Sequence, residues 1–392
     1  MKKYLIVNTG SASKKYALYE GDKRLFFSHF ETENGGYILT NFYGDSIEKK
    51  NITQDSFNDS LNFVLGELVN HKRISDYSDV MAIGVRVVAP GNYFLEHRLL
   101  DEKYLSELQI AKEKAPLHLT SILIEIEKIK KMFPSTVLYG ISDSAFYKDL
   151  PTVAKTYGIS TDIAEKYGIY RFGYHGLSLQ SLVSKIPKVF GRLPSKTVVC
   201  HIGGGVSLVA IKDGQVVDTS MGFTPLEGLL MATRVGDIDS GAILYLQEKT
   251  GMSILEVRKY LNSECGLLGV SEKSADVRDL IDLEKQGDKL ATLALNLYSY
   301  KIKKYIGAYT AAMNGLNGIV FSGTIGERSF IMRERILRDL ECFGVKLNLD
   351  KNDLAIAEDK VISSWLSKVK VMVVPTDEMK QLAVETLNLA KD

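Results

Sequence analysis

Polar residues suited to phosphate chemistry gather in two glycine-rich turns. Asn8, Ser11, Ser13 and Lys15 cluster in the first turn, and the second turn reads HIGGG over residues 201–205. Small residues in a tight turn leave the backbone N–H groups uncovered, and such groups bind phosphate oxygens. The two turns therefore predict binding of a polyphosphate.

The two turns belong to a gapless internal repeat. KYLIVNTGSASKKYALYEGDK (residues 3–23) aligns with KTVVCHIGGGVSLVAIKDGQV (residues 196–216). Each copy has the pattern of a strand, a small-residue turn, a second strand and an acidic-glycine turn. Chance similarity between two β-hairpins is the alternative, because hairpin punctuation is generic. A true repeat predicts two related domains that grip one phosphorylated ligand between them.

Five further polar residues interrupt apolar runs or lie beside glycine. Arg86 lies within the apolar run 83–88, where an unpaired guanidinium is costly. Asp143 follows a predicted strand, and ligand sites gather at strand ends in open α/β sheets. The other three are His118 in APLHL, His175 in FGYHGLS and Arg234 in MATRVGDIDSG. Each has a structural alternative, an Arg paired with an Asp or a His satisfied in the core. Their number in glycine-flanked positions favours a functional site.

The elements that must position these residues are of mixed α/β type. Helical periodicity runs from Ile122 to Phe133 and from Leu290 to Met313. Pro187 to Pro194 punctuate the chain just before the second hairpin, where the second half is expected to begin its own sheet. Apolar runs predict six buried strands, Tyr4–Val7, Val80–Val88, Val137–Ile141, Thr197–Ile202, Gly318–Ser322 and Val369–Val374.

Length and composition are typical of a globular enzyme with two domains. The chain has 392 residues, of which 45% are hydrophobic and 25% charged. A net charge of +1 gives no electrostatic footprint for nucleic acid or an anionic membrane. No apolar run has the length of a signal peptide or a transmembrane helix, so we expect a cytoplasmic protein. The three cysteines lack CxxC spacing and indicate neither disulfides nor a zinc site.

Taken in order along the whole chain, the motifs resemble the acetate and butyrate kinase family of the actin, hexokinase and sugar-kinase fold group. They are NTGSASKKYAL, APLH, DSAF, FGYHGLS, CHIGGG, DTSMGFTPLEG, TRVGDID, SECGLLGVS, SADVRD and PTDE. The resemblance implies two related actin- or ribonuclease-H-like domains (duplicated βββαβαβα) with an active-site cleft between them. We place these domains at residues 1–150 and 151–392, with the last helix packing back on the first domain. It also implies a homodimer that acts on small molecules and binds neither nucleic acid nor membrane.

The implied reaction moves the γ-phosphoryl group of ATP onto acetate, giving acetyl phosphate and ADP. Arg86, His175 and Arg234 match the charge-stabilising residues of the family, and guanidinium groups suit a carboxylate beside a phosphate. Asn8 and Glu378 match the positions that bind Mg²⁺ or Mn²⁺. The segments implied to bind the nucleotide are Lys15; His201, Ile202, Gly203, Gly204 and Gly205; Asp276, Val277 and Arg278; and Thr324, Ile325, Gly326, Glu327 and Arg328.

The acyl group is implied to lie against a small pocket beside Arg86. Its members are Val88, Leu117, His118, Tyr174 and Pro225, with Tyr174 in place of the usual Phe or Ala. Asp143 matches the position usually given to the proton donor or acceptor. A short carboxylic acid, with a pKa of about 4.3 to 5, is already an anion at neutral pH and offers no proton. We therefore favour Asp143 as an orienter of the metal or of Arg86.

Departures from the family pattern leave the substrates open. Val85, Ala89 and Pro90 replace two His and a Gly beside Arg86. The loop FSGTIGER has Thr324 in a position that is Gly in relatives, and Arg328 in place of Asn. Three interpretations follow: an acetate kinase; an acyl kinase with another short acid such as propionate, or with pyrophosphate or phosphate as donor; and a non-catalytic nucleotide-binding relative. Retention of the three charge-stabilising residues disfavours the last.

Overall fold

The chain divides into two compact units. The computed structural model describes residues 2–10, 13–33, 35–44 and 46–391, and the side chains of residues 33, 117 and 118 are outside this description. Ser11 of the first turn also lies outside it. Unit 1 comprises Met1–Lys148 and Asp377–Asp392, and unit 2 comprises Asp149–Thr376. The C-terminal helix therefore groups with the first half of the chain.

Unit 1 is built on an eight-stranded sheet with the order β5-β4-β3-β2-β1-β6-β8-β7. Its central strand β1 is buried on both faces, because Leu5, Ile6 and Val7 are fully covered. The elements are β1 (Lys3–Thr9), β2 (Ser13–Glu20), β3 (Lys23–Glu33), β4 (Gly36–Tyr43), β5 (Ser46–Ile52), α1 (Gln54–Asn58), α2 (Ser60–Asn70), β6 (Val80–Val87), β7 (Arg98–Leu99), α3 (Glu102–Lys114), α4 (Pro116–Met132), β8 (Val137–Ser142) and α16 (Glu378–Leu389).

Unit 2 is built on a six-stranded sheet with the order β11-β10-β9-β12-β14-β13. The elements are α5 (Thr152–Lys155), α6 (Thr161–Tyr167), α7 (Gly176–Phe190), β9 (Lys196–Ile202), β10 (Val206–Lys212), β11 (Gln215–Thr219), α8 (Ser240–Thr250), α9 (Ile254–Ser263), α10 (Gly266–Ser271), α11 (Val277–Lys285), α12 (Lys289–Ala312), β12 (Gly318–Ser322), α13 (Gly323–Arg328), α14 (Phe330–Leu337), α15 (Leu349–Leu354), β13 (Lys360–Val361) and β14 (Lys370–Val373).

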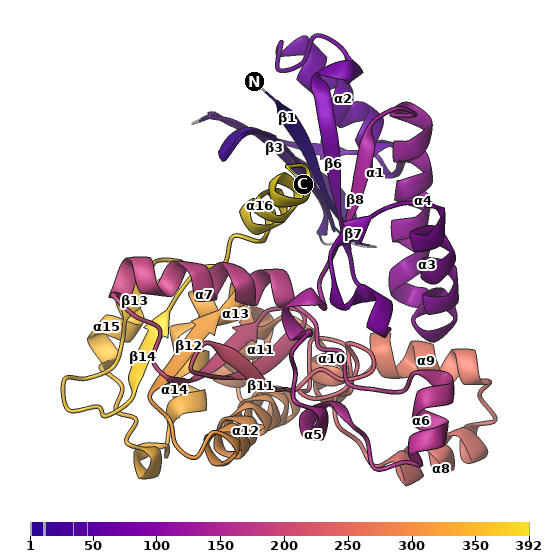
Figure 1. Ribbon diagram of the computed structural model, residues 1–392. Coiled ribbons are helices and arrows are strands. Elements are labelled where there is room, and N and C mark those ends of the chain that lie inside the picture. Colours follow the sequence, from indigo (N-terminus) through magenta and orange to yellow (C-terminus); the bar gives the residue numbers. More distant parts are fainter. Residues whose placement is uncertain (1, 11–12, 34, 45, 392) are drawn as a thin grey trace. The chain divides into compact units, whose positions relative to one another are not determined.

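Helices cover both faces of each sheet. In unit 1, α16 contacts β1, β6 and β8, whereas α2 and α4 contact the sheet from the other side (Figure 1). In unit 2, α12 lies along β9, β10 and β11, and α7 lies on the opposite side of the sheet (Figure 1). Sheets covered on both faces explain why the central strands are continuous apolar runs.

The internal repeat of the sequence is a repeat of the fold. β1 and β9 lie at equivalent positions in the two copies of the repeat, and each pairs antiparallel with the next strand of its hairpin. Each also pairs in parallel with the first strand that follows a long crossover, β6 or β12. The order β3-β2-β1-β6-β8 of unit 1 thus matches β11-β10-β9-β12-β14 of unit 2. The expected pair of related α/β domains is confirmed, and chance similarity of the two hairpins is excluded.

Two features differ from the sequence expectations. β4 and β5 extend the first sheet beyond the predicted strands, and β5 is largely exposed, as expected of a lysine-containing edge strand. Pro187 does not interrupt the chain before the second hairpin, because α7 continues through it to Phe190. Its position in the last turn leaves little helix to disrupt.

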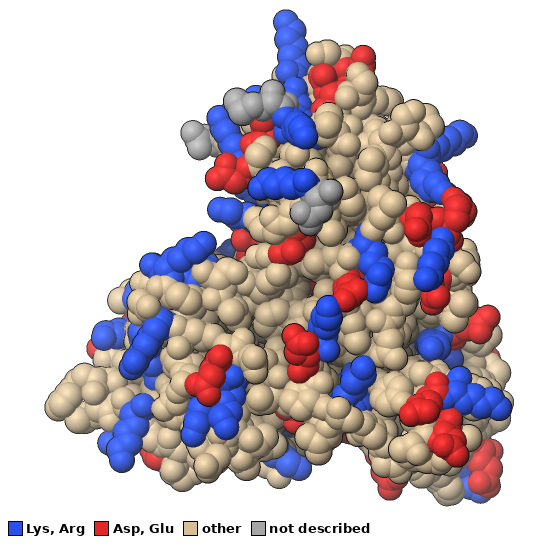
Figure 2. Space-filling view, in the orientation of Figure 1, with Lys and Arg blue, Asp and Glu red and all other residues tan. Residues whose placement is uncertain are grey.

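The surface carries charges of both signs. On the face drawn in Figure 2, Lys and Arg side chains are interspersed with Asp and Glu. None of the helices within the described ranges combines the length and the apolar character needed to cross a bilayer.

Candidate active site

In unit 1, polar groups converge on the guanidinium of Arg86. Arg86 lies near the end of β6, and its neighbour in β8 is Ile141, so the residue after β8, Asp143, lies beside it. Nη2 of Arg86 donates to Oδ2 of Asp143 at 2.9 Å and Nε donates to Oδ1 at 3.3 Å. Nη1 donates to Oδ1 of Asn8 at 3.2 Å and lies 3.9 Å from Oε2 of Glu378. Four sequence-predicted site residues are thus brought together.

The Arg86 cluster is electrostatically matched. Asp143 is only 1% exposed and would be costly to bury without a cation. Burial lowers the pKa of Arg86, but the charges of Asp143 and Glu378 outweigh it, so the pKa is raised overall. The bidentate geometry fixes the orientation of the guanidinium, and the role of Asp143 in catalysis stays a prediction.

His97, which sequence reasoning missed, supports this cluster. Its Nδ1 accepts a hydrogen bond from the backbone N–H of Ser142 at 3.0 Å, and its Nε2 lies 3.7 Å from Oε2 of Glu385 on α16. Burial lowers the pKa of His97 to about 4, although Asp143 opposes this shift. The neutral ring therefore connects the residue before Asp143 to the helix that carries Glu378. No motif marks His97, because its partners are distant in sequence.

In unit 2, His175, Arg234 and the 201–205 turn converge. A Cβ placed on Gly205 would lie 3.3 Å from Nε2 of His175 and 3.7 Å from Nη1 of Arg234. Nη1 of Arg234 donates to the carbonyl oxygen of Pro225 at 3.3 Å. Among the described residues no carboxylate pairs with Arg234, and burial lowers its pKa. A half-buried guanidinium without an acidic partner is suited to binding an anion.

The backbone around Arg234 is held by the SECG motif. The N–H of Cys265 donates to the carbonyl of Thr233 at 3.1 Å. Gly266 follows in a left-handed conformation with φ +68°, and a Cβ there would lie 2.9 Å from both N and O of Arg234. Only glycine allows this approach, which explains why a distant motif is part of the site.

Two serines orient the histidines of unit 2. Nδ1 of His175 and Oγ of Ser207 form a hydrogen bond of 3.0 Å, and Nδ1 of His201 and Oγ of Ser178 form one of 2.8 Å. The two imidazole rings lie 4.4 Å apart between centroids. His175 itself has φ +60° at the start of α7, a strained conformation of the kind that clusters at functional sites. Ser178 and Ser207 were missed, although both lie inside or next to recognised motifs.

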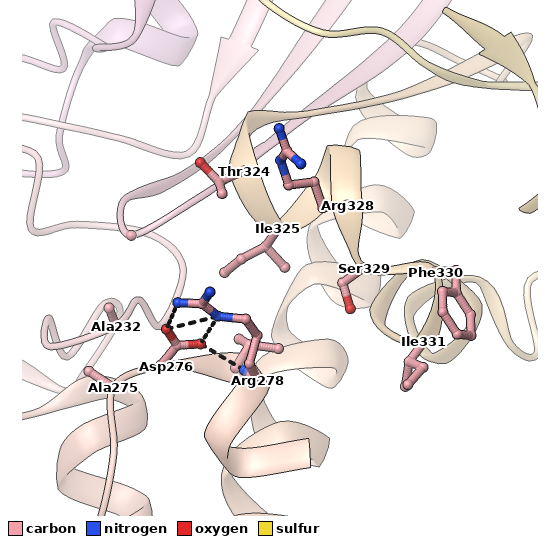
Figure 3. Close-up of a pocket in the computed structure, with 12 residues that line it drawn as sticks. Ala232, Ala275, Asp276, Arg278, Thr324, Ile325, Arg328, Ser329, Phe330 and Ile331 are labelled. Atoms are coloured by element: carbon pink, nitrogen blue, oxygen red, sulfur yellow. Dashed lines mark hydrogen bonds and ion pairs between the residues drawn. The ribbon is translucent and has the colours of Figure 1, made fainter. Parts of the chain in front are cut away.

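A cavity of about 440 Å³ opens beside the 201–205 turn. Seven sequence-predicted nucleotide residues line it, and five further residues were missed (Figure 3). The predicted residues are Gly204, Asp276, Val277, Arg278, Thr324, Ile325 and Arg328, and the missed ones are Ala232, Ala275, Ser329, Phe330 and Ile331. The segment FSGTIGER, expected to be a loop, forms the end of β12 and helix α13. The missed Phe330 and Ile331 start α14 just after it and supply apolar surface suited to a base.

The two arginines of the cavity differ in their partners. Arg278 is held by Asp276, with Nη2 donating to Oδ2 at 2.6 Å and Nε donating to Oδ1 at 3.1 Å. The side chain of Arg328 has no hydrogen bond or ion pair within the described part of the chain. In Figure 3, Arg328 and Thr324 lie on one side of Ile325 and the Arg278–Asp276 pair lies on the other. Arg328 is therefore the cavity's uncommitted cation among these residues.

Several predicted nucleotide residues do not line this cavity. They are Lys15, His201, Ile202, Gly203, Gly205, Gly326 and Glu327. Lys15 lies in unit 1, opposite Asn8 across the first hairpin. Glu327 has a structural task, because its Oε1 accepts from the N–H groups of Gly323 at 2.9 Å and Thr376 at 3.2 Å.

Helix α13 is held by Arg333, another residue that the sequence did not mark. It is fully buried, and its Nη1 donates to the carbonyl of Gly326 at 2.9 Å.

The predicted acyl-pocket residues are divided between the units. In unit 1, Val88 is partly buried, and Leu117 and His118 lie in the first turn of α4 with side chains outside the described part. In unit 2, Pro225 is buried beside Arg234, and Tyr174 is buried with its hydroxyl donating to the carbonyl of Phe223 at 2.7 Å. Tyr174 thus presents its ring and keeps its polar atom satisfied.

Comparisons with known proteins show the family to which this chain belongs. The model of the acetokinase family matches residues 3–384. Acetate kinases of Acetivibrio thermocellus and Thermotoga maritima are 37% and 39% identical to this chain, over 99% of it and over 99% and 98% of their own lengths. The crystal structure of Porphyromonas gingivalis acetate kinase has a TM-score of 0.87 at 33% identity, covering 99% of this chain and 100% of that one. A propionate kinase structure from Francisella tularensis has a TM-score of 0.90 at 31% identity, with the same coverage. The resemblance in the motifs is confirmed, and the chain belongs to the acetokinase family.

Proposed function

We propose that this protein catalyses reversible phosphoryl transfer from ATP to acetate, giving acetyl phosphate and ADP. The observation that carries the proposal is the position of the 201–205 turn. Gly204 of this turn lines the cavity, and Gly205 lies against His175 and Arg234. A nucleotide whose base occupies the cavity would therefore extend its phosphates along the turn towards a histidine and a guanidinium.

The chemistry asks mainly for positioning and neutralisation of charge. A carboxylate oxygen of acetate attacks the γ-phosphorus, and the bond from that phosphorus to the bridging oxygen breaks, leaving its electron pair on ADP. The transferring group is metaphosphate-like, with charge on its equatorial oxygens. Arg234 and His175 supply N–H donors to those oxygens, and the backbone N–H groups of the turn hold the donor phosphates.

Arg86 would bind the acetate carboxylate, and Asp143 would hold the guanidinium of Arg86 in place. Asp143→Asn keeps the shape but removes the charge that orients Arg86. We expect a higher magnesium requirement and an unchanged acidic limb in the pH profile of kcat/KM. A shifted acidic limb with unchanged magnesium dependence would restore the proton-transfer role.

The oxygen atoms around Arg86 also suit a divalent cation. Asn8 brings an amide oxygen and Glu378 a carboxylate close to Nη1 of Arg86, and Mg²⁺ prefers such hard oxygen ligands together with phosphate and water. Asn8 and Glu378 would hold Mg²⁺, which neutralises phosphate charge when bound.

The test is trapping of the acyl phosphate with hydroxylamine. Acetate with ATP and Mg²⁺ should give acetyl hydroxamate, and Arg234→Ala should abolish most of it. Pyrophosphate replaces ATP in a parallel arm, since Arg328 offers an unpaired cation to a free phosphate group. Product with pyrophosphate alone would reassign the donor, and no product with either donor would contradict the proposal.

Propionate is the second candidate acceptor. The Francisella tularensis structure named a propionate kinase matches this chain with a TM-score of 0.90. The same trapping assay with propionate compares kcat/KM for the two acids. One methylene in an apolar pocket typically changes this ratio by about 10- to 200-fold, so the preferred acid will be evident.

We further propose that the protein acts as a homodimer through unit 2. Helix α8 contains no buried residue, and Leu244 and Tyr245 are 67% and 63% exposed. Ile254 and Leu255 at the start of α9 are 69% and 68% exposed. A second copy covering this apolar surface would explain how α8 remains helical. Sedimentation of the wild type and of Leu244→Asp tests the assignment, and a monomeric wild type would contradict it.

A further inference from the structure

The segment that carries Pro225 has no helix or strand of its own. It runs from Gly222 to Gly228, after β11 and before Arg234. Pro225 is part of the proposed acyl pocket, and its carbonyl accepts the hydrogen bond from Nη1 of Arg234. The position of this irregular segment therefore determines where Pro225 lies in the proposed acyl pocket and how the guanidinium of Arg234 is oriented.

Two tyrosines hold the main chain of Phe223. Its N–H donates to the hydroxyl oxygen of Tyr157 at 2.8 Å, and its carbonyl accepts from the hydroxyl of Tyr174 at 2.7 Å. Both main-chain polar groups of a residue two positions before Pro225 are thus fixed by side chains from another part of unit 2. Loop backbone needs such partners, because no ladder satisfies it.

Glu227 and Arg171 complete the arrangement around Tyr157. The Tyr157 hydroxyl donates to Oε2 of Glu227, and Nη2 of Arg171 donates to Oε1 at 2.6 Å. Burial and Glu227 raise the pKa of Tyr157, so the phenol keeps the proton that it donates. Nη1 of Arg171 also donates to the carbonyl of Thr219 at 3.1 Å, where the segment leaves β11.

The Glu227 carboxylate and the Tyr157 hydroxyl lie directly against the main chain at Gly222. A Cβ at this position would overlap the carboxylate of Glu227 and the hydroxyl of Tyr157. The N–H of Phe172 donates to the carbonyl of Gly222 at 3.0 Å, which joins the segment to the irregular stretch before His175. The absence of a side chain at Gly222 is therefore required for the contact.

We propose that Tyr157, Glu227 and Arg171 form a clamp that positions the Gly222–Gly228 segment, and thereby sets affinity and size selectivity for the acyl acceptor. The three residues are positioning residues, since they act through Phe223 and Pro225. None of them lines the nucleotide cavity, so the clamp should act on the acceptor and on Arg234, and should not affect how the cavity binds the nucleotide. The proposal rests on the proposed acyl-kinase function.

Tyr157→Phe is the sharpest test, because it removes one hydroxyl and keeps the ring on which Arg171 stacks at 5.5 Å. We expect KM for acetate to rise about tenfold, in line with the loss of a buried hydrogen bond to an otherwise unsatisfied N–H. The preference between acetate and propionate should relax, and KM for ATP should stay unchanged. Glu227→Gln, which keeps one of the two acceptor oxygens and loses the charge, should change KM for acetate in the same direction. Tyr300→Phe is the matched control, because Tyr300 is 57% exposed on α12.

Hydrogen–deuterium exchange separates the clamp from the proposed function. The peptide covering residues 219–228 should lose protection in Tyr157→Phe, while the peptide of β12 keeps it. A wild type that makes no acyl phosphate would refute the proposed function, and the exchange result would still test the clamp. An unchanged KM for acetate, an equal rise in both KM values, or unchanged exchange in the segment overturns the clamp. If Tyr157→Phe does not fold, Glu227→Gln is judged by the same criteria.

Discussion

The two units each present one arginine to the proposed reaction, and the two arginines are held in opposite ways. Arg86 in unit 1 is gripped by Asp143 on two nitrogens and by Asn8 on the third. Arg234 in unit 2 touches a carbonyl oxygen and the sulfur of Met231. The pKa of Arg86 is raised by its carboxylate neighbours, whereas burial lowers the pKa of Arg234. One charge is balanced before any substrate arrives, and the other has no acidic partner among the described residues.

Equivalent halves of the fold can therefore carry arginines with two different tasks. A balanced guanidinium is rigid and is suited to orienting an acceptor carboxylate. A desolvated guanidinium without a carboxylate partner is suited to stabilising negative charge that develops during the reaction, because no protein carboxylate already neutralises it.

The largest expected effect is on kcat, which should fall to a similar extent when either arginine is removed. Arg86→Ala and Arg234→Ala should each lower kcat by on the order of 10² to 10⁴, the range for removal of a preorganised charge from a phosphoryl transition state. Steady-state kinetics at saturating ATP and acetate measures this. Near-wild-type kcat in either variant would remove that arginine from the proposed mechanism.

Stability of the unliganded protein should separate the two arginines. Arg86→Met leaves Asp143 buried without a cation and should lower the free energy of unfolding by about 3–5 kcal/mol. Arg234→Met removes a desolvated charge with no acidic partner and should change it by less than about 1 kcal/mol. Urea denaturation without nucleotide measures both. Equal losses in the two variants would contradict the comparison.

The support of the Arg86 cluster should be sensitive to acid through His97. Its pKa is about 4 in the folded protein, against about 6.5 when unfolded, so the unfolded state binds more protons between these values. The contribution of the neutral His97 ring to the free energy of unfolding is therefore complete above pH 6.5 and decreases as the pH falls towards 4. The decrease should be about 2 kcal/mol between pH 7 and pH 5.

His97→Asn removes this titration and retains an acceptor for the N–H of Ser142. The gap in unfolding free energy between the wild type and His97→Asn should then narrow as the pH falls. His71→Asn, at a side chain that is 48% exposed, is the control. Wild-type and His97→Asn curves that run parallel from pH 7 to pH 5 would show that His97 does not contribute in this way.

The smallest effect concerns the donor cavity of unit 2. Thr324 carries a β-branched side chain on the cavity wall, where a Gly would let the backbone approach a base more closely. Thr324→Gly should lower KM for ATP by about threefold and leave kcat nearly unchanged, as expected for uniform binding. Titration with ATP, GTP and pyrophosphate measures the accompanying gain in discrimination. No change in any of these values would show that the base does not meet Thr324.

Much of the fold was predictable because its signals are local. The six predicted strands correspond to β1, β6, β8, β9, β12 and β14, since apolar runs flanked by turn residues form buried strands wherever both sheet faces are covered. α4 and α12 follow from their helical periodicity, and α4 ends before Pro134 as predicted. β4 and β5 were missed, because an edge of mixed polarity resembles a loop in sequence.

The site was predictable only where a motif carried it. Seven cavity residues were foreseen from motifs, whereas Phe330, His97 and Arg333 were not, because nothing in their neighbouring residues marks them. Glu327 was predicted to bind the nucleotide, which stays a prediction, and its carboxylate accepts a hydrogen bond from the backbone N–H of Gly323. The type of a residue and its spacing in a motif do not reveal which group will be its hydrogen-bond partner in the fold.

By itself, the sequence determined the repeated hairpins, the α/β class and the order of the chemical motifs, because these depend on residues close together along the chain. Only the tertiary structure decided that Asp143 pairs with Arg86, that Arg234 has a carbonyl and a thioether as its contacts, and that Tyr157 holds the main chain of Phe223. The pairs Asp143–Arg86 and Tyr157–Phe223 join residues that are 57 and 66 positions apart, whereas the partners of Arg234 are 9 and 3 positions away and are brought to it by the fold of an irregular segment. Their energies depend on burial and on the partner's geometry, and neither quantity is written in local periodicity.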